Sequence, residues 1–299
     1  MAEILYGAPV REEIKEKLKE RIKKLEKKPV LAIVQVGDRP DSNLYIKNKI
    51  KFGEEIGVEV VLKKFKHDTN TRMNSNDTDE DHIIKEVEKL NEDENISGII
   101  VQLPLPEGLD TKKILQNIKK EKDADGLAPL PLGEGVGGGT LITPATARAV
   151  LAILDFYKIE ILGKKACVIG QSLLAGRPIS DELEKRGGQV ERCDINTKNV
   201  PLVASSCDIL ISAVGKIGLV NRDFVNERQV VIDVGINTSP PTPLLNAGEG
   251  GKPTTFVGDV DFQEVESVVK AITPVPGGVG PVTVACLFQN LLDLCYHSS

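Results

Sequence analysis

The chain has 299 residues and a formal net charge of -6, and 27% of its residues are charged while 40% are apolar. This balance is typical of a soluble globular protein and excludes the disordered and membrane classes, and the length predicts two domains. The lysine-rich run at 15–28 is interleaved with Glu at helical spacing, which argues against nucleic acid as a partner.

The cysteines indicate whether the protein binds a metal, and the N-terminus indicates the cellular compartment. The five cysteines stand apart, with no C-x-x-C pair and no metal-ligand spacing, so we expect reduced thiols and no bound metal. The N-terminus lacks the apolar core of a signal peptide, and we find no run of about eighteen apolar residues. We therefore expect a cytoplasmic protein that does not enter a membrane.

The first half predicts alternating helices and strands. Apolar residues at helical spacing predict a helix over 10–25, and the apolar run 30–36 predicts a strand. The elements expected next are a helix capped by Ser42, a strand over 58–65, a helix around 83–90, a strand over 98–103 and a helix from Asp110 or Thr111 to about Lys120. Such alternation favours a parallel sheet. The polar stretch 67–81 is typical of an exposed loop.

The second half has the same alternation after an irregular segment. Gly and Pro crowd the segment 129–140, and we place the domain boundary where it ends at Thr143 and Pro144. The elements expected after it are a helix to Tyr157, a strand over 165–169, a helix over 178–186 and strands over 189–193, 209–214 and 230–234. This order predicts a doubly wound sheet, which binds ligands at the carboxyl ends of its strands.

One loop in this half is a candidate nucleotide site. Residues 170–178 follow a strand and open a helix whose N-terminus could hold a pyrophosphate, but they lack the G-x-G-x-x-G pattern, and an ordinary turn explains them about as well. Asp194 ends the next strand, where nucleotide-binding sheets place the carboxylate that accepts from the ribose hydroxyls. A solvated Asp is the alternative, yet the loop and Asp194 together favour a dinucleotide.

Four residues of the first half could carry chemistry. Tyr45 and Lys49 are four positions apart and share one side of a helix. Gln102 follows a buried strand, and Asp125 lies in a turn before Gly126. Each has an ordinary structural explanation by itself. Near the C-terminus, the Pro- and Gly-rich segment 274–285 forms a rigid surface poor in side chains, suited to a flat ligand or to a tight loop before a helix.

Together these segments resemble the bifunctional methylenetetrahydrofolate dehydrogenase/methenyltetrahydrofolate cyclohydrolase family over nearly the whole chain. The similar segments are 41–49, 98–106, 122–126, 168–178, 231–237, 257–260 and 274–285. The resemblance implies an α/β protein of two domains with a cleft between them. An N-terminal catalytic domain with parallel strands would span 1–142 and be completed by 281–299, and a Rossmann-like doubly wound NAD(P)-binding domain would span 143–280.

The resemblance also implies roles for individual residues. Lys49 would be the central catalytic residue, Tyr45 would pack against the folate ring, Gln102 would tune the lysine and Asp125 would accept hydrogen bonds from the pterin. The folate site would further include Val101, Leu103, Pro276, Gly277, Gly278, Val279, Gly280, Pro281 and Val282. The nucleotide site would include Gly170, Gln171, Ser172, Asp194, Thr197, Ala213, Val214, Gly215, Ile236 and Thr283.

The implied activity is oxidation of 5,10-methylenetetrahydrofolate with NAD or NADP, followed by hydrolysis of the methenyl product to 10-formyltetrahydrofolate, without a metal. A homodimer is also implied, with 189–192 and 203–208 as two candidate pairing strands. The chain departs from the family pattern at four positions. Gln171 replaces an Arg and Asp194 a neutral or basic residue, which favours NAD over NADP. Ile142 and Pro131 replace a Cys and an Asn.

Three other functions remain open at this point. One is a single-activity, NAD-dependent methylenetetrahydrofolate dehydrogenase. A second is a non-catalytic homologue that binds folate or nucleotide, although such a protein is expected to have lost Lys49, Gln102 or Asp125. The third is an unrelated hydroxy-acid dehydrogenase, which needs a catalytic His or Arg. The histidines, His67, His82 and His297, lie far in sequence from the strand ends of the second half, where the nicotinamide is expected, which disfavours it.

Overall fold

The computed structural model describes residues 1–66, 79–128, 142–239 and 255–297, and the chain divides into two compact units. The three-stranded unit comprises Glu12–Ala145 and Val284–Ser299, and the six-stranded unit comprises Met1–Arg11 and Thr146–Thr283. Both sheets are parallel, so the α/β class and the two-domain organisation are confirmed. Met1–Arg11 lies with the six-stranded unit, whereas the boundaries expected from sequence put it in the other domain.

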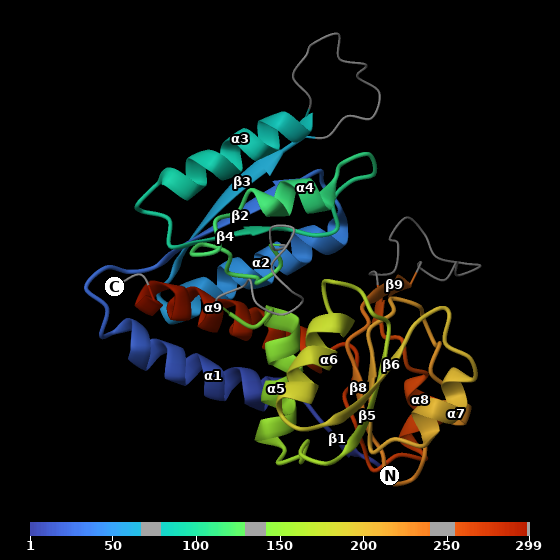
Figure 1. The fold of residues 1–299 in the computed structure, drawn as a ribbon. Helices are drawn as coiled ribbons and strands as arrows, with labels where there is room; N and C mark the ends of the chain where they lie inside the picture. Colours follow the sequence, from blue (N-terminus) through green and yellow to red (C-terminus); the bar gives the residue numbers. More distant parts are fainter. Residues whose placement is uncertain (67–78, 129–141, 240–254, 298–299) are drawn as a thin grey trace, which may run out of the picture. The chain divides into compact units, whose positions relative to one another are not determined.

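The sheet of the three-stranded unit has the order β3-β2-β4. Its strands are β2 (Val30–Val36), β3 (Glu59–Phe65) and β4 (Gly98–Val101). Two helices, α3 (Asp79–Glu92) and α4 (Thr111–Gln116), cover one face (Figure 1). Their apolar side chains, including Ile83 and Ile114, pack with Ala32 and Ile99 of the strands. Burial of this apolar surface is the main stabilising term for this layer.

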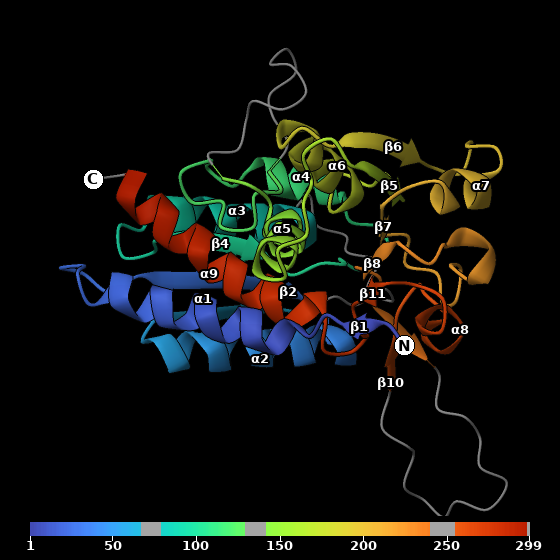
Figure 2. The ribbon, with the colours of Figure 1, turned by 90° about the horizontal axis from the view of Figure 1, so that it is seen from below.

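The opposite face carries α2 (Pro40–Ile56) and α9 (Val279–His297), with α1 (Gly7–Ile22) beside them (Figures 1 and 2). The rings of Phe52 and Phe288 meet with centroids 5.3 Å apart. Gly98 lets α9 approach the sheet, because a methyl group there would lie 2.5 Å from Leu291 Cδ1. Over Val279–Tyr296, α9 is long and apolar enough to span a membrane, but 61% of this stretch is buried, as in the core helix of a globular protein.

The sheet of the six-stranded unit has the order β1-β11-β8-β7-β5-β6, with all strands parallel. The strands are β1 (Glu3–Ile4), β5 (Lys165–Ile169), β6 (Gln189–Cys193), β7 (Ile209–Ser212), β8 (Val230–Asp233) and β11 (Ala271–Ile272). The chain winds outward from β5 to β6 and then returns to β7 on the other side of β5. The order therefore reverses between β5 and β7, the point at which doubly wound sheets bind ligands.

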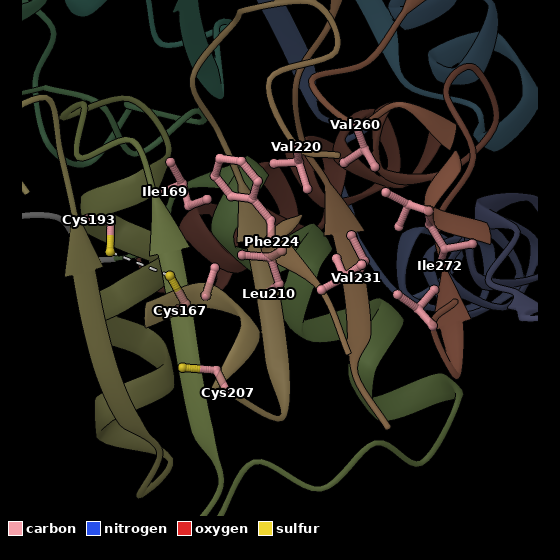
Figure 3. Packing of buried hydrophobic residues seen from close by; sticks show 14 residues of the cluster. Cys167, Ile169, Cys193, Cys207, Leu210, Val220, Phe224, Val231, Val260 and Ile272 are labelled. Atoms are coloured by element: carbon pink, nitrogen blue, oxygen red, sulfur yellow. Dashed lines mark hydrogen bonds between the residues drawn. The ribbon is translucent and has the colours of Figure 1, made fainter. Parts of the chain in front are cut away.

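Helices flank this sheet, and an antiparallel pair of strands extends from it. The helices are α5 (Ala145–Phe156), α6 (Gly176–Lys185), α7 (Val200–Ser205), α8 (Phe262–Glu266) and the 3-10 turn η1 (Arg222–Phe224). The strands of the antiparallel pair are β9 (Asn237–Ser239) and β10 (Thr255–Val257). Figure 3 shows one core layer, in which Cys193, Cys167, Leu210, Val231 and Ile272 come from neighbouring strands. The thiols of Cys167 and Cys193 lie 3.5 Å apart in this apolar layer, as reduced cysteines used for packing.

Several local expectations need correction. Helix α2 begins at Pro40 after Arg39, so Ser42 lies inside the helix and does not cap it, because proline is favoured in the first turn. The stretch 203–208, expected as a pairing strand, begins within α7. Asp110 does cap α4, accepting from Lys113 N at 3.0 Å. Of the loop expected over 67–81, residues 79–81 instead form the first turn of α3, and residues 67–78 fall outside the described residues. The loop expected at 129–140, with Pro131, also falls outside them.

Candidate functional site

Lys49 and Gln102 form the centre of the candidate site in the three-stranded unit. Lys49 lies on α2, and Gln102 directly follows β4. Lys49 Nζ donates a hydrogen bond of 2.9 Å to Gln102 Oε1, while Gln102 Nε2 donates to the Leu103 carbonyl at 2.7 Å. Both ends of the amide are therefore engaged, and its oxygen is fixed toward the lysine.

Burial makes Lys49 a weaker base than an exposed lysine. Desolvation lowers the pKa of Lys49, and the negative charge of Asp125 acts in the opposite direction. Desolvation likewise raises the pKa of Asp125, opposed by the positive charge of Lys49. The two groups thus stabilise each other's charged forms, while burial favours both neutral forms. Opposed effects of this kind make the pair a candidate for proton transfer.

The turn that carries Asp125 is held by a second carboxylate that the sequence analysis did not identify. Asp123 is 2% exposed and accepts from Gly126 N at 2.9 Å and from Ala128 N at 2.7 Å. Burial raises the pKa of Asp123 to about 6. Its position two residues before Asp125 was the only signal in the sequence. Asp123 therefore orders the turn that presents Asp125.

Asn290 of α9 ties the same turn to the start of α5. Its Nδ2 donates to the Ala124 carbonyl at 3.1 Å and to the Thr143 carbonyl at 3.0 Å. Asp125 itself accepts through its backbone carbonyl from Ala145 N at 3.2 Å. The C-terminal helix thus contributes to the geometry of residues near the middle of the chain, which sequence spacing does not reveal.

The other site residues predicted in this unit lie on the same elements. Tyr45 precedes Lys49 by one turn of α2, and burial raises the pKa of Tyr45 to about 12, with a contribution from Asp41. Val101 is the last, buried residue of β4, and Leu103 follows Gln102. The helix α2, the end of β4 and the turn 122–126 after α4 therefore place all of Tyr45, Lys49, Val101, Gln102, Leu103 and Asp125.

The six-stranded unit brings the predicted nucleotide residues to the ends of β5 and β7. Gly170 follows β5 with φ of +91°, and a methyl group at its Cα would overlap the carbonyl of Ala213, which follows β7. Only glycine combines this backbone conformation with so close an approach. Val214, Gly215 and Ile236 follow at the same carboxyl edge, and the side chains of Val214 and Ile236 are 41% and 40% exposed.

Gln171 and Asp194 differ in where their polar groups are engaged. Gln171 Nε2 donates to the Val168 carbonyl at 3.0 Å and lies 3.3 Å from Ser180 Oγ, so this side chain is turned into the loop. Asp194 is exposed after β6, and the backbone hydrogen bond from Asn196 holds its pKa below the usual range. Its Oδ1 also accepts from Thr197 Oγ1 at 3.2 Å. Asp194 is therefore charged at neutral pH. Ser172, next to Gln171 in the loop after β5, is exposed.

The predicted folate-binding loop belongs to the six-stranded unit. Gly277, with φ of +107°, accepts through its carbonyl from Gly7 N at 2.8 Å. The loop then enters α9, where Thr283 Oγ1 donates to the Val279 carbonyl at 3.2 Å. Residues Pro276, Gly277, Gly278, Val279, Gly280, Pro281, Val282 and Thr283 all fall in this unit. Within the described ranges, no group of three or more His, Cys, Asp or Glu side chains is arranged to hold a metal ion.

Family models and known proteins match the chain over both of its units. The catalytic-domain model of tetrahydrofolate dehydrogenase/cyclohydrolase matches residues 5–125, and the NAD(P)-binding-domain model matches residues 144–299. The chain is 39% identical over 297 residues to bifunctional protein FolD 2 of Lactobacillus johnsonii, with 98% of each chain covered.

Solved structures give the same result. A bifunctional FolD methylenetetrahydrofolate dehydrogenase/cyclohydrolase from Campylobacter jejuni superposes with a TM-score of 0.84 at 36% identity, covering 100% of both chains. The Trypanosoma brucei enzyme complexed with NADP and an inhibitor gives a TM-score of 0.86 at 32% identity, covering 99% of this chain and 98% of that one. The chain therefore belongs to the tetrahydrofolate dehydrogenase/cyclohydrolase family.

Proposed function

We propose that the chain oxidises 5,10-methylenetetrahydrofolate to the methenyl form with NAD(P) and hydrolyses that product to 10-formyltetrahydrofolate. Family membership over both units supports the pair of activities. The observation that carries the proposal is the part-buried hydrogen bond between Lys49 and Gln102, with Asp125 close enough to influence the lysine. These are the residues that the family resemblance assigns to catalysis.

Lys49 is the proposed general base and acid of the hydrolysis. Because desolvation lowers the pKa of Lys49, its neutral amine forms more readily than that of an exposed lysine and can take a proton from the attacking water. Gln102 holds the amine in place through its oxygen, since its amide NH2 is committed to Leu103. The protonated lysine can then return the proton to the leaving ring nitrogen.

Asp125 and Tyr45 are proposed to bind the folate ring system. A carboxylate accepts from the amino and ring N–H groups of a pterin, and the turn ordered by Asp123 keeps Asp125 in place for this. The tyrosine ring offers an aromatic face, and burial keeps its hydroxyl protonated. Val101 and Leu103 supply apolar contact at the end of β4, and the loop Pro276–Val282 is proposed to line the rest of the folate site.

The edge formed by Gly170 and Ala213 suits a dinucleotide. The backbone at Gly170 lies directly against the carbonyl of Ala213, and α6 begins at Gly176, six residues after Gly170. Asp194 is proposed to accept from the ribose hydroxyls, and the hydrogen bond from Thr197 Oγ1 supports this by holding its carboxylate. When bound, the nicotinamide accepts the hydride from the methylene carbon. The charge of Asp194 and the inward turn of Gln171 lead us to propose a preference for NAD over NADP.

A two-wavelength assay tests this function. Purified protein is mixed with 5,10-methylenetetrahydrofolate and either NAD or NADP, and reduced nicotinamide and the methenyl product are followed together. We expect reduced nicotinamide to form while the methenyl absorbance stays low, because hydrolysis follows oxidation. Accumulation of the methenyl product would indicate the single-activity dehydrogenase. Absence of turnover with both nucleotides would indicate a non-catalytic homologue.

We further propose that the protein is a cytoplasmic homodimer. The edge of β6 (Gln189–Cys193) is the remaining candidate for strand pairing between two copies, since the other candidate segment begins in a helix. The mass in solution, measured by sedimentation equilibrium, tests the dimer. A monomer at micromolar concentration would contradict it.

A further inference from the structure

Asp259 is a buried carboxylate to which the activity above assigns no role. It lies in the segment after β10, and its exposed fraction is 0%. Its Oδ2 accepts from Ser212 Oγ (3.0 Å), Val214 N (2.7 Å) and Gly215 N (3.2 Å), and its Oδ1 accepts from Lys216 N (2.8 Å) and Asn237 Nδ2 (3.1 Å). Five donors therefore converge on one carboxylate, which compensates for its burial.

The turn after β7 is shaped around this carboxylate. Successive backbone N–H groups that point to one place form an anion-binding concavity, and in many proteins a ligand phosphate fills it. Here the backbone N–H groups of residues 214, 215 and 216 all point to Asp259. The turn is consequently fixed without a ligand, and these N–H groups are not free to bind a phosphate.

A second carboxylate fixes the position of Asp259. Asp233, at the end of β8, accepts from Gly235 N at 2.9 Å, from Asp259 N at 3.1 Å and from Val260 N at 2.9 Å. Glycines make room for both side chains, since a methyl group at Gly235 would overlap the Asp259 carboxylate and one at Gly258 would overlap the Asp233 carboxylate. The ends of β7 and β8 and the segment 258–260 are thus joined through two buried aspartates.

The same turn forms one wall of the proposed nucleotide edge. Ala213, whose carbonyl contacts Gly170, is the residue just before the N–H groups that Asp259 binds. Asn237, which donates to Asp259, directly follows Ile236, another of the predicted nucleotide contacts. Displacement of Asp259 would therefore release Ala213, Val214 and Ile236 together, while leaving the three-stranded unit unaltered.

We propose that Asp259 is a positioning residue for dinucleotide binding, which fixes the turn 213–216 against the Gly170 loop. The inference rests on the proposed dehydrogenase activity. Asp259 does not touch the nucleotide; it acts through the backbone of the turn. Loss of its charge therefore weakens the binding of NAD and NADP alike, and the hydrolysis of added methenyltetrahydrofolate, which depends on Lys49, continues.

The test compares Asp259→Asn with Asp261→Asn. The second variant makes the same change two residues away, at an exposed cap of α8. In Asp259→Asn at least one backbone N–H would face an amide NH2, and we expect the dissociation constants of NAD and NADP, measured by titration calorimetry, to rise about tenfold or more. Hydrolysis of added methenyltetrahydrofolate is expected to stay within about twofold of the native rate. Asp261→Asn is expected to change neither quantity.

Two milder variants keep the inference testable if Asp259→Asn does not fold. Ser212→Ala and Asn237→Ala each remove one donor and retain the carboxylate, and we expect each to weaken dinucleotide binding about threefold with hydrolysis unchanged. Unchanged dinucleotide binding in the folded variants, or equal loss of binding and hydrolysis, would overturn the role of Asp259. Native protein that binds neither NAD nor NADP would instead contradict the proposed function itself.

Discussion

Gln102 Oε1 accepts a hydrogen bond of 2.9 Å from Lys49 Nζ, although 53 positions separate the two residues in the chain. The lysine comes from a helix and the glutamine from the end of a strand. Because Gln102 Nε2 is bound to the Leu103 carbonyl, the amide cannot turn its NH2 group toward the lysine without losing that bond. The pair therefore holds the amine of Lys49 at one place in both of its protonation states.

Replacement of Lys49 by Met is expected to abolish hydrolysis of methenyltetrahydrofolate while folate binding persists. Methionine retains most of the side-chain volume and removes the proton carrier, and loss of a general base costs about 100-fold or more in rate. Lys47→Met, at an exposed position of the same helix, is the matched control and is expected to remain active. Near-normal hydrolysis by Lys49→Met would exclude the proposed role of this lysine.

Gln102→Glu is expected to move the pH dependence of hydrolysis toward higher pH. A carboxylate beside Lys49 favours the ammonium form, so the pKa of Lys49 rises and the neutral amine forms at higher pH. The ascending limb of kcat against pH is then expected to move up by about one pH unit or more. Gln102→Ala is expected to lose activity without that displacement, because the amine loses its fixed position. An unshifted limb in an active Gln102→Glu would show that Lys49 does not set this limb.

The native protein is expected to use NAD at least about tenfold better than NADP, measured as kcat/KM. The charged Asp194 would lie beside the 2′-phosphate, and like charges near a surface cost about a kcal/mol or more. Asp194→Ser is expected to reduce this preference. Adding Gln171→Arg reduces it further only if the arginine leaves the inward path that Gln171 takes toward Val168. A native preference for NADP would contradict this account of Asp194.

Asp123 is expected to make the protein less stable as pH rises from about 4 to about 7. Its folded pKa of about 6 is raised above the value in an unfolded chain, so the folded state binds the proton more tightly, and this contribution is full at low pH and lost as the carboxyl ionises. A shift of this size corresponds to about 3 kcal/mol. The quantity to measure is the free energy of unfolding of the native protein minus that of Asp123→Asn, because other titrating groups cancel. A difference that stays constant or rises with pH would contradict the prediction.

The sequence by itself determined the class of fold and most of the strands. The buried strands 30–36 and 165–169 have the bounds read from their apolar runs, because a strand covered on both faces needs a continuous apolar segment. Strand 189–193 also has the predicted bounds, although only Cys193 of this strand is buried. The candidate residues Lys49, Gln102 and Asp125 were also chosen from sequence. Their family resemblance supplied the roles, since no spacing rule relates residues so far apart.

Only the tertiary structure determined which very short segments form strands, because such segments are too short to show a hydrophobic periodicity. It also determined which distant segments of the chain are in contact. β1 and β11 have two residues each and exist because they pair along the edge of a sheet. The burial that lowers the pKa of Lys49, the ordering of Asp125 by Asp123 and the convergence of five donors on Asp259 depend on packing between segments far apart in the chain. Local sequence carries no signal for such packing, because the free energy of a buried charge is set by its neighbours in space.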